Sequence, residues 1–156
     1  MREIFLELGD EAKFKIIRAL KEYSPNEIGG ILIGEKNIEN NLIVSDVSVS
    51  NEAKIHRYSS FTRETKIAQK LLEKHHRNNT GYYIGEWHSH PNFALYPSVK
   101  DVETMEGIIS DPNYNVSFAI LCIVKLNKDS NLEMRGFLFH RSLEKFVTLN
   151  SESDCL

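Results

Sequence analysis

Between Gly85 and Asp101 the sequence holds two histidines, a serine and an aspartate at the spacing of a hydrolytic site with one metal ion. His88 and His90 lie two positions apart, so both imidazoles project to the same side of an extended strand, in which side chains alternate between faces. Zinc accepts imidazole nitrogens and carboxylate oxygens, and three protein ligands leave its fourth position open for water. Such an open position distinguishes a catalytic zinc site from a structural one.

The residues around the histidine pair predict the elements that must carry the ligands. Residues 82–84 are aromatic and β-branched types that favour a strand, and Pro91 cannot donate to a continuing sheet ladder, so the strand should end there. After a loop of seven residues, Pro97 and Ser98 lead into a helical pattern at residues 102–109. We therefore expect Asp101 to return as a third ligand from the first turn of a helix.

A further carboxylate lies far upstream. Glu27 stands directly before residues 28–34, an apolar run short enough to be a buried strand. A carboxylate at that position could act as a general base. From spacing alone, however, a solvated residue at the edge of a strand is the better interpretation of Glu27.

A glutamate ahead of an apolar strand, followed by His-x-His-Pro, a loop and Ser-x-x-Asp, resembles the JAMM (MPN-plus) metalloprotease motif. The resemblance covers the chain from about Glu27 to the end of the helix after Asp101. It implies that His88, His90 and Asp101 bind one Zn²⁺ ion, that Glu27 activates the attacking water, and that Ser98 stabilises the tetrahedral intermediate. It also implies the JAMM/MPN fold, which is cytidine-deaminase-like.

Some of these residues have simpler alternatives. Ser-x-x-Asp at the start of a helix is also a capping arrangement, so Ser98 can serve as a helix cap as well as an oxyanion donor. Glu86 shares strand parity with the histidines and is either close to the site or a solvated carboxylate. The aromatic residues near the site either line a groove for a substrate tail or pack in the core: Trp87, Phe93 and Tyr96.

The local sequence of residues 83–92 is similar to that of the deconjugating peptidases of bacterial antiphage CBASS operons. Pro97 and Ser98 before the aspartate, and residues 60–63 upstream, share this similarity. That similarity implies cleavage after the C-terminal residue of a cGAS/DncV-like nucleotidyltransferase, joined to its target through an extended tail. It also implies E1-like and E2-like protein partners.

Three other functions compete with this one. A related bacterial deconjugase would cut an isopeptide bond behind a ubiquitin-like protein with the same zinc site. A RadC-like, DNA-associated protein shares the metal motif, but its usual His-Asn-His-Pro-Ser-Gly wording is not found in this sequence. A non-catalytic MPN scaffold would have a broken site, whereas every position of the motif is filled here.

The bulk properties agree with a small protein-processing enzyme. The chain of 156 residues fits a single domain spanning residues 1–156, and its net charge of -3 with scattered Lys and Arg argues against nucleic acid. The sequence contains neither an apolar stretch of about 18 residues nor a secretory signal, so it predicts neither a membrane span nor export. Cys122 lies in an apolar run and Cys155 near the end, a usage typical of a reducing compartment, so we expect a cytoplasmic protein.

The hydrophobic pattern predicts an α/β fold in which helices sandwich a mixed β-sheet. Asp10 is expected to cap the first helix, whose apolar stripe contains Phe14, Ile17, Leu20 and Ile16. The polar tail, residues 150–154, is expected to fray. The predicted helices cover residues 11–22, 62–77 and the segment after Asp101, and the predicted strands cover residues 28–34, 42–49, the histidine segment, 118–125, 132–140 and 145–149.

Overall fold

A computed structural model describes residues 3–50 and 63–151 of the chain. The predicted helix start at Thr62, most of the segment 60–63, Cys155 and the end of the tail lie outside these residues. The elements, in chain order, are β1 (Phe5–Leu8), α1 (Asp10–Tyr23), β2 (Gly29–Lys36), β3 (Leu42–Val47), α2 (Arg63–Asn78), β4 (Tyr82–Ser89), α3 (Val99–Ser110), β5 (Phe118–Leu126), β6 (Leu132–His140) and β7 (Val147–Ser151).

The strands form one mixed sheet in the order β1-β3-β2-β4-β5-β6-β7, which confirms the predicted mixed sheet. β4 pairs with β5 in parallel, whereas β2 pairs with both β3 and β4 in antiparallel fashion. The sheet closes into a barrel because β1 pairs with β7 through Phe5 with Asn150 and Leu6 with Ser151. The prediction that the tail frays from residue 150 is therefore wrong for Asn150 and Ser151.

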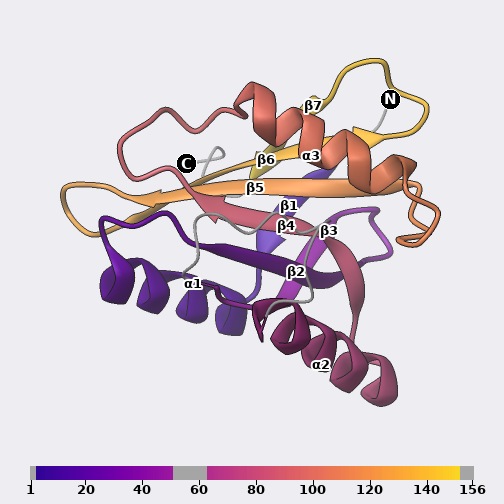
Figure 1. Cartoon of the computed structure of the whole chain (residues 1–156), viewed down its shortest axis with the longest axis horizontal. Coiled ribbons are helices and arrows are strands. Elements are labelled where there is room, and N and C mark those ends of the chain that lie inside the picture. The colour runs from indigo at the N-terminus through magenta and orange to yellow at the C-terminus, as the bar shows by residue number, and fades with distance from the viewer. Residues whose placement is uncertain (1–2, 51–62, 152–156) are drawn as a thin grey trace.

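Helices cover the sheet on two sides, with α1 and α2 on one face and α3 on the other (Figure 1). Side chains of β5 alternate between two hydrophobic clusters, as the period of two in a strand requires. The cluster that includes α1 contains Ile120, Cys122 and Val124, and the cluster that includes α3 contains Ala119, Leu121 and Ile123. The metal ligands predicted on β4 and α3 are therefore expected on the α3 face of the sheet.

Helix α1 buries Ile16 and Leu20 as predicted, but the rest of its buried face differs from the prediction. Its buried face consists of Ala12, Ile16, Ala19 and Leu20, whereas Phe14 is 61% exposed. The small alanines let the helix lie close to the sheet, and the buried positions still follow helical spacing. Asp10 is not the cap: Gly9 holds that position and its N–H donates to the carbonyl of Val44 (2.8 Å).

Strand β4 contains an irregularity at Gly85 that decides which way its later side chains point. Gly85 has a φ of 152°, and a Cβ there would lie 1.9 Å from the carbonyl oxygen of Ile120. The register between β2 and β4 shifts beside it, so Ile84 and Trp87, although three residues apart, both join the α1 cluster. His88 therefore lies on the α3 face, in register with Ile123 of β5.

Candidate metal centre

Three predicted ligands converge where β4 ends and α3 begins. The Nε2 atoms of His88 and His90 are 3.0 Å apart, and Asp101 Oδ2 lies 3.3 Å from the first and 3.4 Å from the second. Within the described parts of the chain this is the one group of three such side chains that could hold a metal ion. The three side chains span thirteen positions of the sequence, and the structure brings them together from the end of β4 and the start of α3.

Asp101 is held in position by the start of its own helix. Ser98 is the N-cap of α3: its Oγ accepts the backbone N–H of Asp101 (3.1 Å), and Asp101 Oδ2 accepts the backbone N–H of Ser98 (2.8 Å). This reciprocal pair is a capping box, with aspartate in the place of the more usual glutamate. The predicted capping alternative for Ser98 is therefore confirmed, and the same pair aims the Asp101 carboxylate at the histidines.

His90 is oriented by two backbone carbonyls. Its backbone N–H donates to Val124 of β5 (3.0 Å), and its Nδ1 lies 3.1 Å from the carbonyl oxygen of Ala94 in the following loop. A carbonyl only accepts, so Nδ1 carries a proton and Nε2 keeps its lone pair whenever the ring is neutral. A metal-binding histidine is commonly oriented in this way.

His90 and Asp101 each favour the charged form of the other. Hydrogen bonding to Asp101 raises the pKa of His90 despite its burial, and the Ala94 carbonyl and the charges of Asp101 and Glu27 act in the same direction. Burial alone would raise the pKa of the Asp101 carboxyl, but hydrogen bonds with His88 and His90 hold it well below its usual range. Asp101 is therefore ionised at neutral pH and can offer a carboxylate oxygen to a metal ion.

Glu27 reaches this site through the pairing of β2 with β4. Gly29 is in register with His88, and the backbone N–H of Ser89 donates to the carbonyl of Ile28 (2.9 Å). The buried Ser89 Oγ in turn accepts the N–H of Ile28 (3.0 Å). These two bonds bring the exposed Glu27 near enough to His90 for its charge to contribute to the raised pKa of that histidine.

Ser89 is a positioning residue that sequence reasoning missed. The signal was present in the motif itself: in His-Ser-His the middle side chain points to the opposite face from the ligands. A small polar side chain on a buried face needs a hydrogen-bond partner, and here the partner is the backbone beside Glu27.

The other residues near the motif fall into two groups, buried and exposed. Trp87 is fully buried and its Nε1–H donates to the Ser48 carbonyl (2.8 Å), so it packs in the core. Glu86 is 2% exposed, which makes the solvated alternative wrong. Phe93 is exposed, and its ring lies nearly perpendicular to that of His90 with the ring centres 6.3 Å apart. The half-exposed Tyr96 makes a similar perpendicular contact with Phe137.

Cys122 takes no part in this chemistry. It is fully buried in the sheet, and burial raises the pKa of its thiol to about 12. A thiol in that state is neither a nucleophile nor a metal ligand at neutral pH. This agrees with the prediction that it serves as a small buried hydrophobe.

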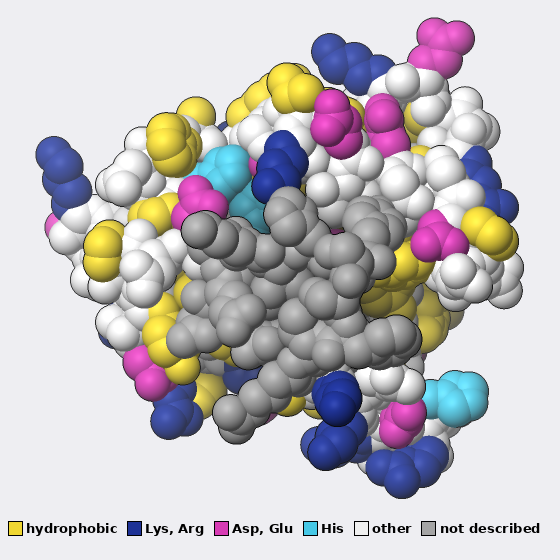
Figure 2. Space-filling view, viewed as in Figure 1, with side chains coloured by type: hydrophobic (Ala, Val, Ile, Leu, Met, Phe, Trp, Pro, Cys, Tyr) yellow, Lys and Arg dark blue, Asp and Glu magenta, His cyan; other side chains and the backbone are white. Residues whose placement is uncertain are grey.

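The donor set fits a zinc ion. Ligands at about 2.1 Å from a tetrahedral zinc ion lie roughly 3.4 Å from one another, and the three separations here are 3.0, 3.3 and 3.4 Å. Two imidazoles and one carboxylate leave a fourth position for another ligand. The site also reaches the surface: histidine atoms border acidic and basic side chains where β4 meets α3 (Figure 2).

Comparison with known proteins places this fold and site in a family. The profile of the prokaryotic homologues of the JAB domain matches residues 11–137. The chain therefore belongs to that family, which confirms the predicted resemblance to JAMM proteins. The solution structure of protein DSY2949 from Desulfitobacterium hafniense has the same fold, with a TM-score of 0.64 over 94% of this chain and 91% of that one at 16% identity.

Several curated relatives carry more specific names. A CD-NTase/cGAS isopeptidase of Enterobacter hormaechei is 31% identical over 64% of this chain and 55% of its own length. One of Vibrio cholerae is 31% identical over 60% and 61%. A probable metalloprotease of Sinorhizobium fredii, y4qB, is 28% identical over 55% and 54%. The chain thus spans a little over half the length of the curated relatives that it matches.

No helix in residues 3–50 and 63–151 is long and apolar enough to cross a membrane.

Proposed function

We propose that this chain is a zinc-dependent metallopeptidase that hydrolyses the amide bond joining the C-terminus of one protein to another molecule. The observation that carries the proposal is the convergence of two imidazole nitrogens and one ionised carboxylate oxygen within 3.4 Å of one another. Membership of the JAB-domain family supports the same chemistry.

In this proposal His88, His90 and Asp101 hold the zinc ion. A zinc ion with an open position polarises a carbonyl as a Lewis acid and lowers the pKa of water to about 7. Glu27, which is open to solvent and whose charge acts on His90, takes the proton from the attacking water and delivers it to the leaving amine. The exposed Ser98 hydroxyl donates to the oxyanion that develops on the carbonyl.

We further propose that the substrate is a conjugated CD-NTase, the nucleotidyltransferase of an antiphage operon. Support comes from three relatives named CD-NTase/cGAS isopeptidase, two of them 31% identical to this chain over the matched segment. Conjugation by E1-like and E2-like proteins would make the bond that this chain cuts. The exposed ring of Phe93, which lies next to His90, is placed to contact the extended tail before that bond.

The test uses the proteins encoded beside this chain, co-expressed with either the wild-type chain or Glu27→Gln, and intact-mass analysis of all of them. We expect conjugates to accumulate only with Glu27→Gln, with a mass that matches a CD-NTase C-terminus joined through an amide. Zinc content measured on the purified chains should be the same, since the substitution keeps size and polarity and spares the ligands.

Equal conjugate levels with both chains would overturn the proposed substrate. In that case a ubiquitin-like conjugate, cleaved by the purified wild-type chain and not by Glu27→Gln, would assign the same chemistry to a different protein. A purified chain that contains no zinc, or whose activity resists a chelator, would contradict the mechanism itself.

A further inference from the structure

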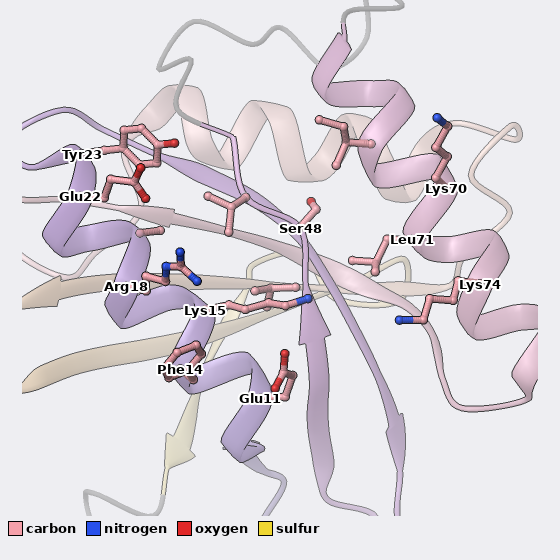
Figure 3. Close-up of a pocket in the computed structure, with 14 residues that line it drawn as sticks. Glu11, Phe14, Lys15, Arg18, Glu22, Tyr23, Ser48, Lys70, Leu71 and Lys74 are labelled. Atoms are coloured by element: carbon pink, nitrogen blue, oxygen red, sulfur yellow. The ribbon is translucent and has the colours of Figure 1, made fainter.

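A groove separates α1 from α2 on the face of the sheet opposite α3. Its volume is about 630 Å³, and its floor is the end of β3 and the residues that follow, Val47 to Val49. Side chains of both helices point into it from the two sides (Figure 3). Because His88 and Asp101 belong to the α3 face, this groove is separate from the metal centre.

The groove exposes apolar side chains that no described residue covers. Phe14 of α1 is 61% exposed and Ile67 of α2 is 45% exposed, and both line the groove together with Leu71. Sequence periodicity assigned Phe14 to the core, yet the helix turns its alanines inward and presents this ring to the groove. Large apolar side chains gathered at one exposed place are typical of a binding surface.

The α2 wall of the groove is positively charged. Lys66, Lys70 and Lys74 form a row of exposed lysines four residues apart, and the last two line the groove. Basic side chains gather over α2 in Figure 2. Like charges at this spacing destabilise a helix, and no described carboxylate forms an ion pair with Lys70 or Lys74. This basic row belongs to a chain whose net charge is -3.

The α1 wall carries mixed charge instead. Arg18 lines the groove between Glu11 and Glu22, while the Lys15 ammonium is engaged by the buried carboxylate of Asp46. A ligand that matches both walls therefore has carboxylates along the side facing α2 and apolar side chains at its centre.

We propose that the α1–α2 groove docks an acidic amphipathic helix of a partner protein. A helix lays its apolar face into a groove of this kind through side chains at i, i+3 and i+4. An added β-strand fits less well: β1 pairs with β3 as far as Val44, and beyond that point the N–H of Val47 already donates to Asp46 Oδ1 (2.8 Å). Charge complementarity with the α2 lysines gives the helix its orientation.

The experiment measures the fluorescence anisotropy of a labelled amphipathic peptide with leucines at helical spacing and glutamates along one flank. The full chain should bind this peptide and should bind it less tightly as salt rises. A companion peptide with lysine in place of each glutamate should not bind. Neither measurement requires zinc or peptidase activity, so the outcome is independent of the proposed function.

Charge reversal distinguishes the groove from general electrostatics. Lys70→Glu combined with Lys74→Glu should weaken binding by about tenfold or more. The matched control combines Lys13→Glu with Arg77→Glu, two exposed cations on the same two helices that do not line the groove. This control makes the same change in net charge and should leave the affinity nearly unchanged. Phe14→Ser, at an already exposed position, should also weaken binding while the melting temperature stays the same.

Two results would overturn the proposal. If the groove variant and its control bind the peptide equally, the contact is not at this groove. If the protein alone forms a dimer in sedimentation velocity and Phe14→Ser returns it to a monomer, the occupant is a second copy of the chain and not an acidic helix.

Discussion

Ser98 shows how one side chain can serve both the fold and the reaction. Its oxygen accepts the N–H of Asp101, which caps α3 and fixes a proposed metal ligand. The hydroxyl proton is not used in that bond, because a hydroxyl donates and accepts at the same time. The side chain is exposed, so in the proposed mechanism this proton is available to an oxyanion.

Substitutions at Ser98 should separate the two roles. We expect Ser98→Ala to lower kcat by ~10²–10³ through loss of the oxyanion donor, and to destabilise the fold by ~1 kcal/mol through loss of the cap. Ser98→Gly should lose the same activity but only a few tenths of a kcal/mol, because glycine is tolerated as a cap. Steady-state kinetics and thermal melts measure the two effects, and zinc content should not change.

The control at this position is Ser98→Thr, which keeps a hydroxyl and a capping oxygen and should retain most of the activity. Wild-type kcat in Ser98→Ala would rule out the oxyanion role. An equal loss in the threonine and alanine variants would point to general disruption of the site instead.

At the scale of elements, Asp46 ties both helices of the α1–α2 face to the sheet. The carboxylate is 5% exposed on β3; its Oδ1 contacts Lys15 of α1, and its Oδ2 lies 2.8 Å from His75 Nε2 of α2. The other ring nitrogen of His75 lies 2.7 Å from the hydroxyl of Thr80, just beyond the helix. One buried carboxylate thus contacts both helices that flank the groove.

This tie should make stability depend on pH in the acid range. Burial would raise the pKa of Asp46, but hydrogen bonds from Lys15 and His75 outweigh it, so the pKa lies below its ordinary value of 3.8. As the pH falls, the Asp46 carboxyl therefore takes up its proton in the unfolded chain before it does so in the folded one. The stabilisation is complete above about pH 4 and is lost as the pH falls through the lower pKa of Asp46 in the folded state. Asp46→Asn should lower the free energy of unfolding at pH 7 by about 1–3 kcal/mol.

Urea titrations at several pH values measure this difference between the wild-type chain and Asp46→Asn. The difference should shrink steadily below about pH 4, since the wild-type carboxyl becomes neutral there as well. Other carboxyls titrate in both chains and cancel in the comparison. A difference that stays constant down to pH 2 would show that the charge of Asp46 does not contribute.

At the scale of the whole molecule, the proposed zinc ion would join elements that are otherwise held by non-covalent contacts. Its ligands come from the end of β4 and the first turn of α3, with the loop of residues 91–97 between them. A ligand that binds only the folded state stabilises it by ~4 kcal/mol at a concentration a thousand times its Kd. Zinc should therefore raise the melting temperature of the intact chain.

The measurement is a thermal melt with zinc, with a chelator, and with zinc restored. The wild-type chain should lose several degrees and all peptidase activity in the chelator, and regain both on addition of zinc. Asp101→Asn should melt at the same temperature with and without zinc, because the charged oxygen ligand is gone. A melting temperature of the wild-type chain that zinc does not alter would contradict the predicted metal centre.

The sequence by itself determined the parts of the site that depend on local spacing. His88 and His90 share a face because a strand alternates, and Asp101 returns from a helix because Ser98 starts that helix with a cap. Most elements were predictable for the same reason, since residues 28–34, 42–49 and 132–140 carry strand patterns within single short windows. The structure places the corresponding strands at Gly29–Lys36, Leu42–Val47 and Leu132–His140.

Only the tertiary structure decided what depends on contacts between distant segments. Glu27 comes near the histidines because Ser89 pairs with Ile28, sixty-one positions away, and no local pattern encodes that register. The four-residue strand Phe5–Leu8 is too short to show a period, yet its pairing with β7 closes the barrel. Phe14 turned outward because packing against the sheet chose the alanine face of α1. Spacing along a chain defines which side chains share a face, whereas pairing and packing define what that face meets.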